Sequence, residues 1–482
     1  MNKEMILSTI AKIMVFFSSL MLIPIGVGLY YGESSLTILA FVKAMVISLA
    51  IFLPLALIKV KSKFIYIKEG FIITSISWVL MAFFGCLPMF FSRQIPSLID
   101  AFFEMASGLT TTGASIILDL DKISNSILFW RSFSHFIGGM GVLVLALAVL
   151  PEITPSSVQA MKAEVPGPQF GKLLPKLKSS ARTLYVIYIF LTLLLVLALV
   201  LAGMPLFESV NHAFATAGTG GFGMKNGSIA YYQSPAIEII LGIGMLVFGV
   251  NFNIYYMILI GKAKEALKSE ELKTYLVIVA LASLAIAFSI FNTYNSFATA
   301  LKDGFFTVSS IMTTTGFATV DFNTWPAFAK WIVLLLMFIG GSAGSTAGGL
   351  KVSRVIISAK AALNEIKKSI NPNRRVSLHY NGKALDKTTE KNILRYLVLY
   401  FLIFGICVLL VSIGVDDLMT AFTAVIATYN NVGPGLEAVG PIGSYAFFPN
   451  FNKILLSLVM IMGRLELMPI LILFYPETWR MN

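Results

Sequence analysis

The apolar positions of the chain form long and short segments in a repeating order. Two long segments come first, at about 6–30 and 36–58, and the order long, short, long then recurs four times. The long segments have the roughly 20 apolar residues with which a helix crosses a bilayer, whereas the short ones cannot cross. The segments of the four quarters are 71–91, 99–110 and 127–150; 182–203, 207–218 and 235–260; 274–292, 297–313 and an interrupted 327–369; and 393–414, 417–430 and 451–475. The pattern predicts an all-α polytopic protein with ten spanning helices and four short helices.

Each short segment ends in a stretch rich in threonine and glycine. The four copies are Thr110-Thr111-Thr112-Gly113-Ala114, Ala217-Gly218-Thr219-Gly220-Gly221, Thr313-Thr314-Thr315-Gly316-Phe317 and Asn430-Asn431-Val432-Gly433-Pro434. The aligned glycines at 113, 220, 316 and 433 are separated by 107, 96 and 117 residues, and such repetition indicates a tandem array of one unit. Phe102, Phe305 and Phe422 each lie eleven residues before their glycine and follow a small residue, whereas the second copy lacks this phenylalanine.

The repeat divides the chain into an N-terminal part and four units. Residues 1–68 form an extra pair of helices, and the units are 69–155, 156–262 with its preceding loop, 263–375 and 376–482. A short run that ends in a turn and returns to the same side is a re-entrant loop, which is tolerated at that depth only inside protein or beside water. We therefore expect four units, each a helix, a pore loop and a second helix, around a central pseudo-fourfold pore.

Composition and charge agree with a membrane protein. The chain is 57% hydrophobic and 12% charged, whereas soluble domains carry about a quarter charged residues. The net charge of +12 is concentrated in the loop after the second helix and in the loops between quarters, which all lie on one face of the predicted topology. By the positive-inside rule this basic face is cytoplasmic, together with both termini, and the re-entrant loops enter from outside. The charge thus indicates orientation and anionic lipid rather than nucleic acid, with a docking surface for a cytosolic partner as the alternative.

The repeated stretch has the chemistry of an ion filter. Four such turns around one axis can direct main-chain carbonyls inward, where they replace the water around a cation. Glycine permits positive φ and leaves the path clear, and the C-terminal end of each short helix contributes negative potential. The predicted filter residues, with K⁺ as the one bound metal ion, are Thr110, Thr111, Thr112, Gly113, Gly218, Thr219, Gly220, Thr314, Thr315, Gly316, Asn431, Val432 and Gly433.

The four-unit pattern with one filter glycine per unit resembles the Trk/Ktr/HKT superfamily of potassium transporters. Three features resemble its bacterial TrkH-type membrane subunits: the extra N-terminal helix pair, the stretch Lys162–Pro168 and the stretch Gly463–Leu467. In this superfamily glycine at all four filter positions goes with potassium and serine at the first with sodium, so the resemblance implies K⁺ as the transported ion. The short filter leaves a less selective K⁺/Na⁺ transporter as an alternative.

A glycine-rich segment follows the third filter stretch. Gly340, Gly341, Ser342, Ala343, Gly344, Ser345, Thr346, Ala347, Gly348 and Gly349 include five glycines within an apolar region. Glycine costs about 1 kcal/mol relative to alanine inside a helix, so this segment is expected to be a loop. The resemblance implies a gating loop, over about 340–350, that obstructs the inner pore. The alternative is a small-residue site at which helices pack closely.

Charged residues inside the predicted helices are few. Arg464 is expected in mid-helix, where a charge is costly and usually functional, and we interpret it as an electrostatic barrier below the filter. The alternative is an ion pair with Glu466, although residues two apart do not face each other on a helix. Arg131 and His135 share a helix face and are expected to form interhelical hydrogen bonds, with a proton relay as the alternative. Glu104, inside the first short helix, is expected to brace the filter.

The sequence therefore predicts potassium uptake through a filter and no enzymatic activity. An H⁺- or Na⁺-coupled symporter is the alternative within transport, and a membrane enzyme would need more ionisable groups at one depth than these helices offer. No nucleotide-binding motif and no cofactor site is found in the sequence, and Cys86 and Cys407 lie in apolar runs. The resemblance implies a homodimer in the bacterial inner membrane, with a TrkA-like ring of nucleotide-binding RCK subunits on the basic face.

Overall fold

The chain folds into helices in the predicted order. The computed structural model describes residues 2–60, 67–141, 177–294, 296–373 and 376–479. The motif at 162–168 and the end of the predicted helix 127–150 lie outside these residues. The N-terminal part consists of α1 (Lys3–Ser19), α2 (Leu22–Tyr30) and α3 (Ser35–Ala56).

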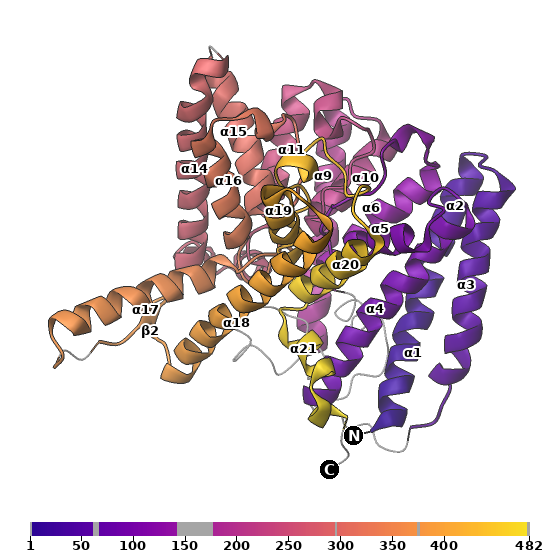
Figure 1. Cartoon of the computed structure of the whole chain (residues 1–482), viewed down its shortest axis with the longest axis horizontal. Helices are drawn as coiled ribbons and strands as arrows, with labels where there is room; N and C mark the ends of the chain where they lie inside the picture. Colours follow the sequence, from indigo (N-terminus) through magenta and orange to yellow (C-terminus); the bar gives the residue numbers. More distant parts are fainter. Residues whose placement is uncertain (1, 61–66, 142–176, 295, 374–375, 480–482) are drawn as a thin grey trace.

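Four units of long helix, short helix and second helix follow (Figure 1). Their helices are α4 (Ile67–Phe91), α5 (Leu98–Leu109) and α6 (Asn125–Gly139); α9 (Leu177–Leu201), α10 (Leu206–Gly218), α11 (Pro235–Phe248), α12 (Phe252–Leu259) and α13 (Ala263–Ala266); α14 (Glu270–Tyr294), α15 (Phe297–Met312), α16 (Ala327–Ile339) and α17 (Val352–Ile370); and α18 (Lys387–Val411), α19 (Leu418–Tyr429), α20 (Asn450–Arg464) and α21 (Met468–Phe474). The predicted all-α class and the helix–pore loop–helix unit are confirmed.

The short helices α5, α10, α15 and α19 begin at residues that favour a helix start. Ser97, Ser296 and Asp417 each accept a hydrogen bond from the backbone N–H three residues later, which satisfies an otherwise unpaired donor. Pro205 takes this place in the second unit. After each short helix an outer loop contains a single 3₁₀ turn, and these are η1 (Leu120–Lys122), η2 (Ser228–Tyr232), η3 (Phe322–Thr324) and η5 (Glu437–Val439). The start of each pore helix is therefore fixed locally by sequence.

In the part of the chain that the structure describes, the second long helix of each unit ends or bends after 13 to 15 residues. Among the described residues six helices are long and apolar enough to span, or seven if the pair α11 and α12, bent by 86°, counts as one. The predicted interruption within 327–369 is confirmed, because α16 ends at Ile339 and α17 begins at Val352. Continuous helices over 235–260 and 451–475 were wrong. Gly249 and Asn251 lie at the first break, and Glu466 and Leu467 adopt φ of 60° and 66° at the second.

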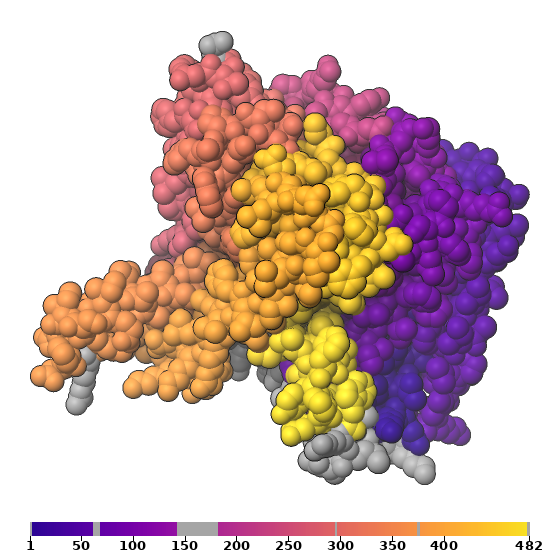
Figure 2. Space-filling view, viewed as in Figure 1, coloured from indigo at the N-terminus to yellow at the C-terminus, as the bar shows by residue number. Residues whose placement is uncertain are grey.

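One part of the structure projects from the body. Helix α17 and the hairpin of β1 (His379–Tyr380) and β2 (Lys383–Ala384) extend to the left in Figure 1, and Figure 2 shows them as an arm beside the body. The two strands are antiparallel, with His379 opposite Ala384 and Tyr380 opposite Lys383. Both termini lie at one end of the molecule (Figure 1). Single-turn 3₁₀ helices at η4 (Ser412–Gly414) and η6 (Pro476–Thr478) complete the elements.

Candidate functional site

The four short helices all end in the same backbone turn. The residue two places before each filter glycine has left-handed φ, with 55° at Thr111, 55° at Thr219, 57° at Thr314 and 55° at Asn431. The glycines that follow also have positive φ, of 80° at Gly113, 74° at Gly221, 86° at Gly316 and 97° at Gly433. Such φ values favour glycine, because a Cβ would collide with the backbone.

This geometry corrects the register of the second copy. The glycine equivalent to Gly113 is Gly221, whereas the predicted Gly220 corresponds to the residue before the glycine in the other copies. The backbone N–H of Gly220 donates to Ala215 O at 2.8 Å, as the N–H of Thr112 donates to Ser107 O at 2.9 Å. In this register Val210, after the small Ser209, takes the place of the missing phenylalanine. Because Gly220 and Gly221 are adjacent, the sequence alone did not show which of them is equivalent to Gly113.

The four turns form one closed cycle. A Cβ added to Gly113 would overlap the carbonyl oxygen of Gly220, and one added to Gly221 would overlap that of Thr315. Likewise, a Cβ on Gly316 would overlap Val432 O, and a Cβ on Gly433 would overlap Thr112 O. Each carbonyl belongs to the residue just before the next filter glycine, so the cycle returns to its start. Four main-chain oxygens and four glycines therefore surround a common axis.

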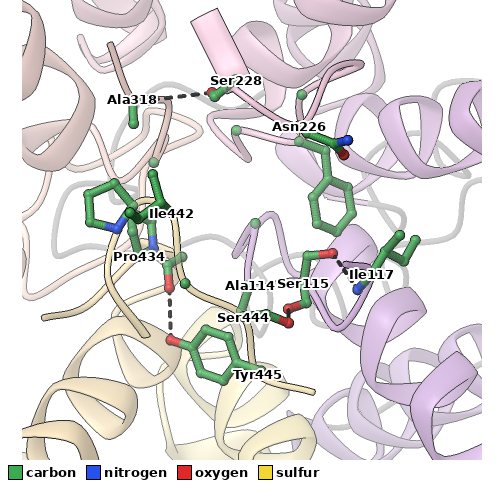
Figure 3. Close-up of a pocket in the computed structure, with 18 of the residues that line it drawn as sticks. Ala114, Ser115, Ile117, Asn226, Ser228, Ala318, Pro434, Ile442, Ser444 and Tyr445 are labelled. Atoms are coloured by element: carbon green, nitrogen blue, oxygen red, sulfur yellow. Dashed lines mark hydrogen bonds between the residues drawn. The ribbon is translucent and has the colours of Figure 1, made fainter. Parts of the chain in front are cut away.

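The glycines open onto a cavity between the outer loops. Gly113, Gly221, Gly316 and Gly433 all line this cavity of about 170 Å³. Figure 3 shows labelled lining residues from all four units, among them Ser115, Asn226, Ala318 and Tyr445. The hydroxyl of Tyr445 donates to Gly433 O at 2.8 Å, which fixes one of these turns.

Hydrogen bonds between successive units close the outer rim of the cavity. Units one and two are joined by Leu120 N–H to Asn226 Oδ1 at 2.7 Å, and units two and three by Ile229 N–H to Ala318 O at 3.2 Å. Units three and four are joined by Glu437 N–H to Asn323 Oδ1 at 2.9 Å. Tyr445 N–H donates to Ser115 O at 2.9 Å and joins unit four to unit one. The rim thus has the same cyclic order as the filter turns, and no motif in the sequence had marked these residues.

An acidic side chain lies beside this rim. Asp119 contacts Lys122 Nζ at 2.9 Å and accepts from Asn226 Nδ2 at 3.1 Å. Lys122 first, and Asn226 next, lower the pKa of the Asp119 carboxyl, because both favour its charged form. The carboxylate near the entrance to the cavity therefore stays ionised to a lower pH than an ordinary aspartate.

A buried ion pair supports the first turn. Glu104 is fully buried in α5 and contacts Arg131 Nη2 of α6 at 2.7 Å. The same carboxylate accepts from Ile116 N–H at 2.9 Å and from the hydroxyl of Ser115 at 3.0 Å. The guanidinium of Arg131 also lies 4.0 Å from the centre of the Phe222 ring. The expected hydrogen bonds from Glu104 to the filter loop are present.

His135 fastens the first turn to the second. Its Nδ1 lies 2.7 Å from Gly108 O, and its Nε2 accepts from Phe222 N–H at 3.3 Å. A carbonyl can only accept and a backbone N–H can only donate, so these partners select the neutral tautomer with hydrogen on Nδ1. Both nitrogens are thereby used for structure. The expected interhelical role of His135 is present, and this arrangement argues against a proton relay.

We expect Glu104→Gln to destabilise the protein by about 3–5 kcal/mol, since it leaves the buried Arg131 without its counter-charge. The midpoint of thermal unfolding of purified protein measures this loss. Glu365→Gln, which breaks an exposed pair with Lys368, is the control and is expected to change stability by less than about 1 kcal/mol. Glu104→Gln combined with Arg131→Gln should cost less than the two single changes added together, and strict additivity would show that the two side chains act independently.

Comparison with known proteins agrees with this geometry. The family model TrkH, described as cation transport protein, matches residues 38–480. The chain belongs to the TrkH family. It is 36% identical to the Trk system potassium uptake protein TrkH of Escherichia coli K12, with 100% of both chains covered, and also 36% identical to that of Salmonella typhimurium LT2 with the same coverage. The crystal structure of the potassium transporter TrkH from Vibrio parahaemolyticus matches with a TM-score of 0.89, 31% identity and 100% of each chain covered.

The glycine-rich segment of this TrkH-family chain is a loop that packs against the third threonine–glycine turn. Gly348 N–H donates to Thr314 Oγ1 of the third turn at 2.7 Å. Ser342 N–H donates to Gly249 O at 2.9 Å, so the loop fills the break between α11 and α12. A Cβ on Gly348 would overlap Asn430 O. The loop therefore contacts the third and fourth turns directly. Its backbone hydrogen bonds hold it there, and the absence of a side chain at Gly348 allows the close approach.

Arg464 is the last residue of α20 and not a mid-helix residue. Its Nη1 donates to Thr346 O at 2.6 Å, and its Nη2 donates to Gly138 O and Gly139 O at 2.6 Å. The predicted helix over 451–475 breaks directly after Arg464, so this residue lies at a helix end. The apolar periodicity of the sequence continues through the break and did not reveal it. Glu466 instead pairs with Arg354 of α17, at 2.5 Å between Oε2 and Nη2. The guanidinium thus lies between the glycine-rich loop and the end of α6, below the filter turns.

Several filter side chains interlock across units. Asn431 Nδ2 donates to Thr112 Oγ1 at 2.9 Å, and the hydroxyls of Thr110 and Thr112 lie 2.7 Å apart. Thr313 and Thr315 repeat the second contact at 2.7 Å. These bonds join the side chains of the turns to one another, whereas the oxygens that adjoin the four glycines belong to the main chain.

Proposed function

We propose that this chain moves K⁺ into the cell through the ring of main-chain carbonyls at Thr112, Gly220, Thr315 and Val432. The observation that carries the proposal is the closed cycle in which each of these oxygens adjoins the glycine of the preceding unit. Carbonyl oxygens around one axis can replace the hydration shell of an alkali cation. Glycine at all four turn positions, with Gly221 in place of Gly220, agrees with potassium, and the relatives are named potassium uptake proteins.

The loop at 340–350 acts as the gate in this proposal. It lies directly under the filter, is held by Thr314 above and by Arg464 from the side, and has glycines at its ends that permit a change of backbone conformation. Arg464 is the electrostatic barrier: its charge lowers the occupancy of cations below the filter. Opening requires that the loop moves and that both contacts break.

The setting proposed for the protein follows from topology and from the names of its relatives. Multiple apolar helices make it a multi-pass membrane protein. We place it in the inner membrane with both termini and the basic arm of α17 in the cytoplasm. The relatives are named as members of a Trk system, which supports a separate regulatory component, a TrkA-like nucleotide-binding ring, against this face of a homodimer. The chain itself needs no cofactor in this proposal.

Ion flux through purified protein in liposomes tests the function. When the regulatory partner has opened the gate, K⁺ is expected to enter the liposomes faster than Na⁺. A proton gradient is expected to leave the rate of K⁺ entry unchanged. A rate that depends on the proton or sodium gradient would favour a symporter, and equal rates for both cations would favour a non-selective transporter. Absence of any cation flux, together with no growth rescue of a strain lacking potassium uptake, would refute transport.

A further inference from the structure

Three successive residues of the loop carry unusual contacts directly below the filter. Gly348 N–H donates to Thr314 Oγ1 at 2.7 Å, so this part of the loop adjoins the third filter turn. The carbonyl of Thr346 accepts from the Arg464 guanidinium at 2.6 Å. The next carbonyl, that of Ala347, accepts from the ammonium of Lys351. Two neighbouring main-chain oxygens below the filter are therefore each bound by a positively charged side chain.

The position of Lys351 costs energy and is nevertheless held by the surrounding backbone. Its side chain is 3% exposed, and its φ of 75° and ψ of 133° lie in a region that side chains other than glycine rarely adopt. Lys351 N–H donates to Ile339 O at 2.9 Å, which ties the end of the loop to the end of α16. A buried ammonium and a strained backbone both oppose folding. The hydrogen bond to Ala347 O offsets part of this cost, which indicates that the lysine is held at this carbonyl by the fold.

A buried carboxylate fixes both ends of the same loop. Glu271 Oε1, on α14, accepts from Ala343 N–H at 2.7 Å and from Ser353 N–H at 3.2 Å. The residues between these two donors form the part of the loop that carries the Thr346 and Ala347 carbonyls. The loop is thus supported from α14 on both sides of these two carbonyls.

We propose that the carbonyls of Thr346 and Ala347 form an inner binding site for a monovalent cation, which Lys351 and Arg464 occupy in this structure as tethered cations. The proposal rests on the proposed function, because the ion that leaves the filter is the ligand of this site. The ammonium of Lys351 is a compact single positive charge, so it can bind a carbonyl oxygen in place of an alkali cation. Transported K⁺ and the two side chains then compete for the same oxygens, so withdrawal of the side chains when the loop moves frees the next site for the ion.

The test removes the tethered ammonium without adding strain. Lys351→Gly takes the positive φ freely, and Lys351→Asn is a second neutral variant. Lys351→Arg retains a charge, and Lys367→Ala removes an exposed lysine of α17 as the matched control. Calorimetric titration of each purified protein with KCl, in a choline chloride background, gives the number of K⁺ ions bound per chain. Flux of K⁺ from liposomes gives the basal transport rate.

We expect Lys351→Gly and Lys351→Asn to bind one more K⁺ per chain than the unmodified protein and to raise basal flux several-fold. Lys367→Ala should match the unmodified protein in both measurements, and Lys351→Arg, which keeps a positive charge on the site, should bind no additional K⁺. Folded neutral variants with unchanged stoichiometry would overturn the inner site, even if flux rises. If neither neutral variant folds, the ammonium is a structural group and the proposal is wrong. Failure of the unmodified protein to pass K⁺, with its regulatory partner present, would instead refute the proposed function.

Discussion

Gly221→Ser is expected to lower K⁺ flux and the preference for K⁺ over Na⁺ by about tenfold or more. The added Cβ would overlap Thr315 O, one of the four oxygens of the ring, and serine would be strained at a φ of 74°. If displacement of this carbonyl weakens the binding of K⁺ by about 1.4 kcal/mol, the affinity for K⁺ falls tenfold. Flux of K⁺ and Na⁺ from liposomes, measured in parallel, gives both quantities. Gly113→Ser, which would displace Gly220 O, is expected to have the same kind of effect.

A glycine two residues further along provides the matched control. A Cβ on Gly223 would meet its nearest atom, Cα of Ser228, at 3.4 Å, and this glycine is not among those with positive φ. Gly223→Ser should therefore leave ion preference unchanged. If Gly221→Ser retains full discrimination while the protein stays folded, the ring of oxygens is not the filter.

Arg464→Gln is expected to raise the basal K⁺ flux about tenfold in protein without its regulatory partner. The change removes the charge below the filter and weakens three charge-assisted hydrogen bonds to Thr346, Gly138 and Gly139. Such bonds contribute about 1.5–3 kcal/mol each, so their loss also favours release of the loop. Liposome flux at low ionic strength measures the rate, and thermal unfolding of the same preparation measures the accompanying loss of stability.

Two variants separate the charge of Arg464 from general effects. Arg464→Lys keeps a positive charge without the forked geometry and should restore part of the barrier. Arg395→Gln removes an exposed arginine of α18 and should change neither flux nor stability. A fall in stability of Arg464→Gln without any rise in flux would mean that the side chain serves only to hold α20 against the loop and α6.

The hydrophobic pattern was sufficient to predict the units but not the breaks within them. The length of an apolar run decides whether its helix can cross a bilayer, so the alternation of long and short runs was sufficient to identify the four units. The bend between α11 and α12 arises at Gly249 and Asn251, in an apolar run that is interrupted only by Asn251 and Asn253 near the bend. A single glycine or asparagine does not by itself mark a bend, and the loop that fills this one comes from the third unit. Such a break depends on a distant partner, so periodicity could not reveal it.

The site shows the same division between local and distant signals. Threonine–glycine turns have a backbone conformation that is set locally, and the four predicted copies form equivalent turns, although the pair Gly220 and Gly221 obscured one register. The partner of Glu466 is Arg354, which is 112 residues away, and local spacing offered only Arg464. The rim contacts of Asn226 and Asn323 join successive units through ordinary loop residues. These contacts exist only after the units have assembled.

The closed cycle has a consequence for how ion preference can change. An assembly of four identical chains receives every substitution four times, whereas here each quarter of the ring is encoded separately. The oxygen is supplied by threonine in two units, Thr112 and Thr315, but by Gly220 and Val432 in the other two. A single exchange therefore perturbs one side of the ion's surroundings and leaves three intact. Under the proposed function, preference among alkali ions can therefore change by substitutions at one quarter of the ring at a time.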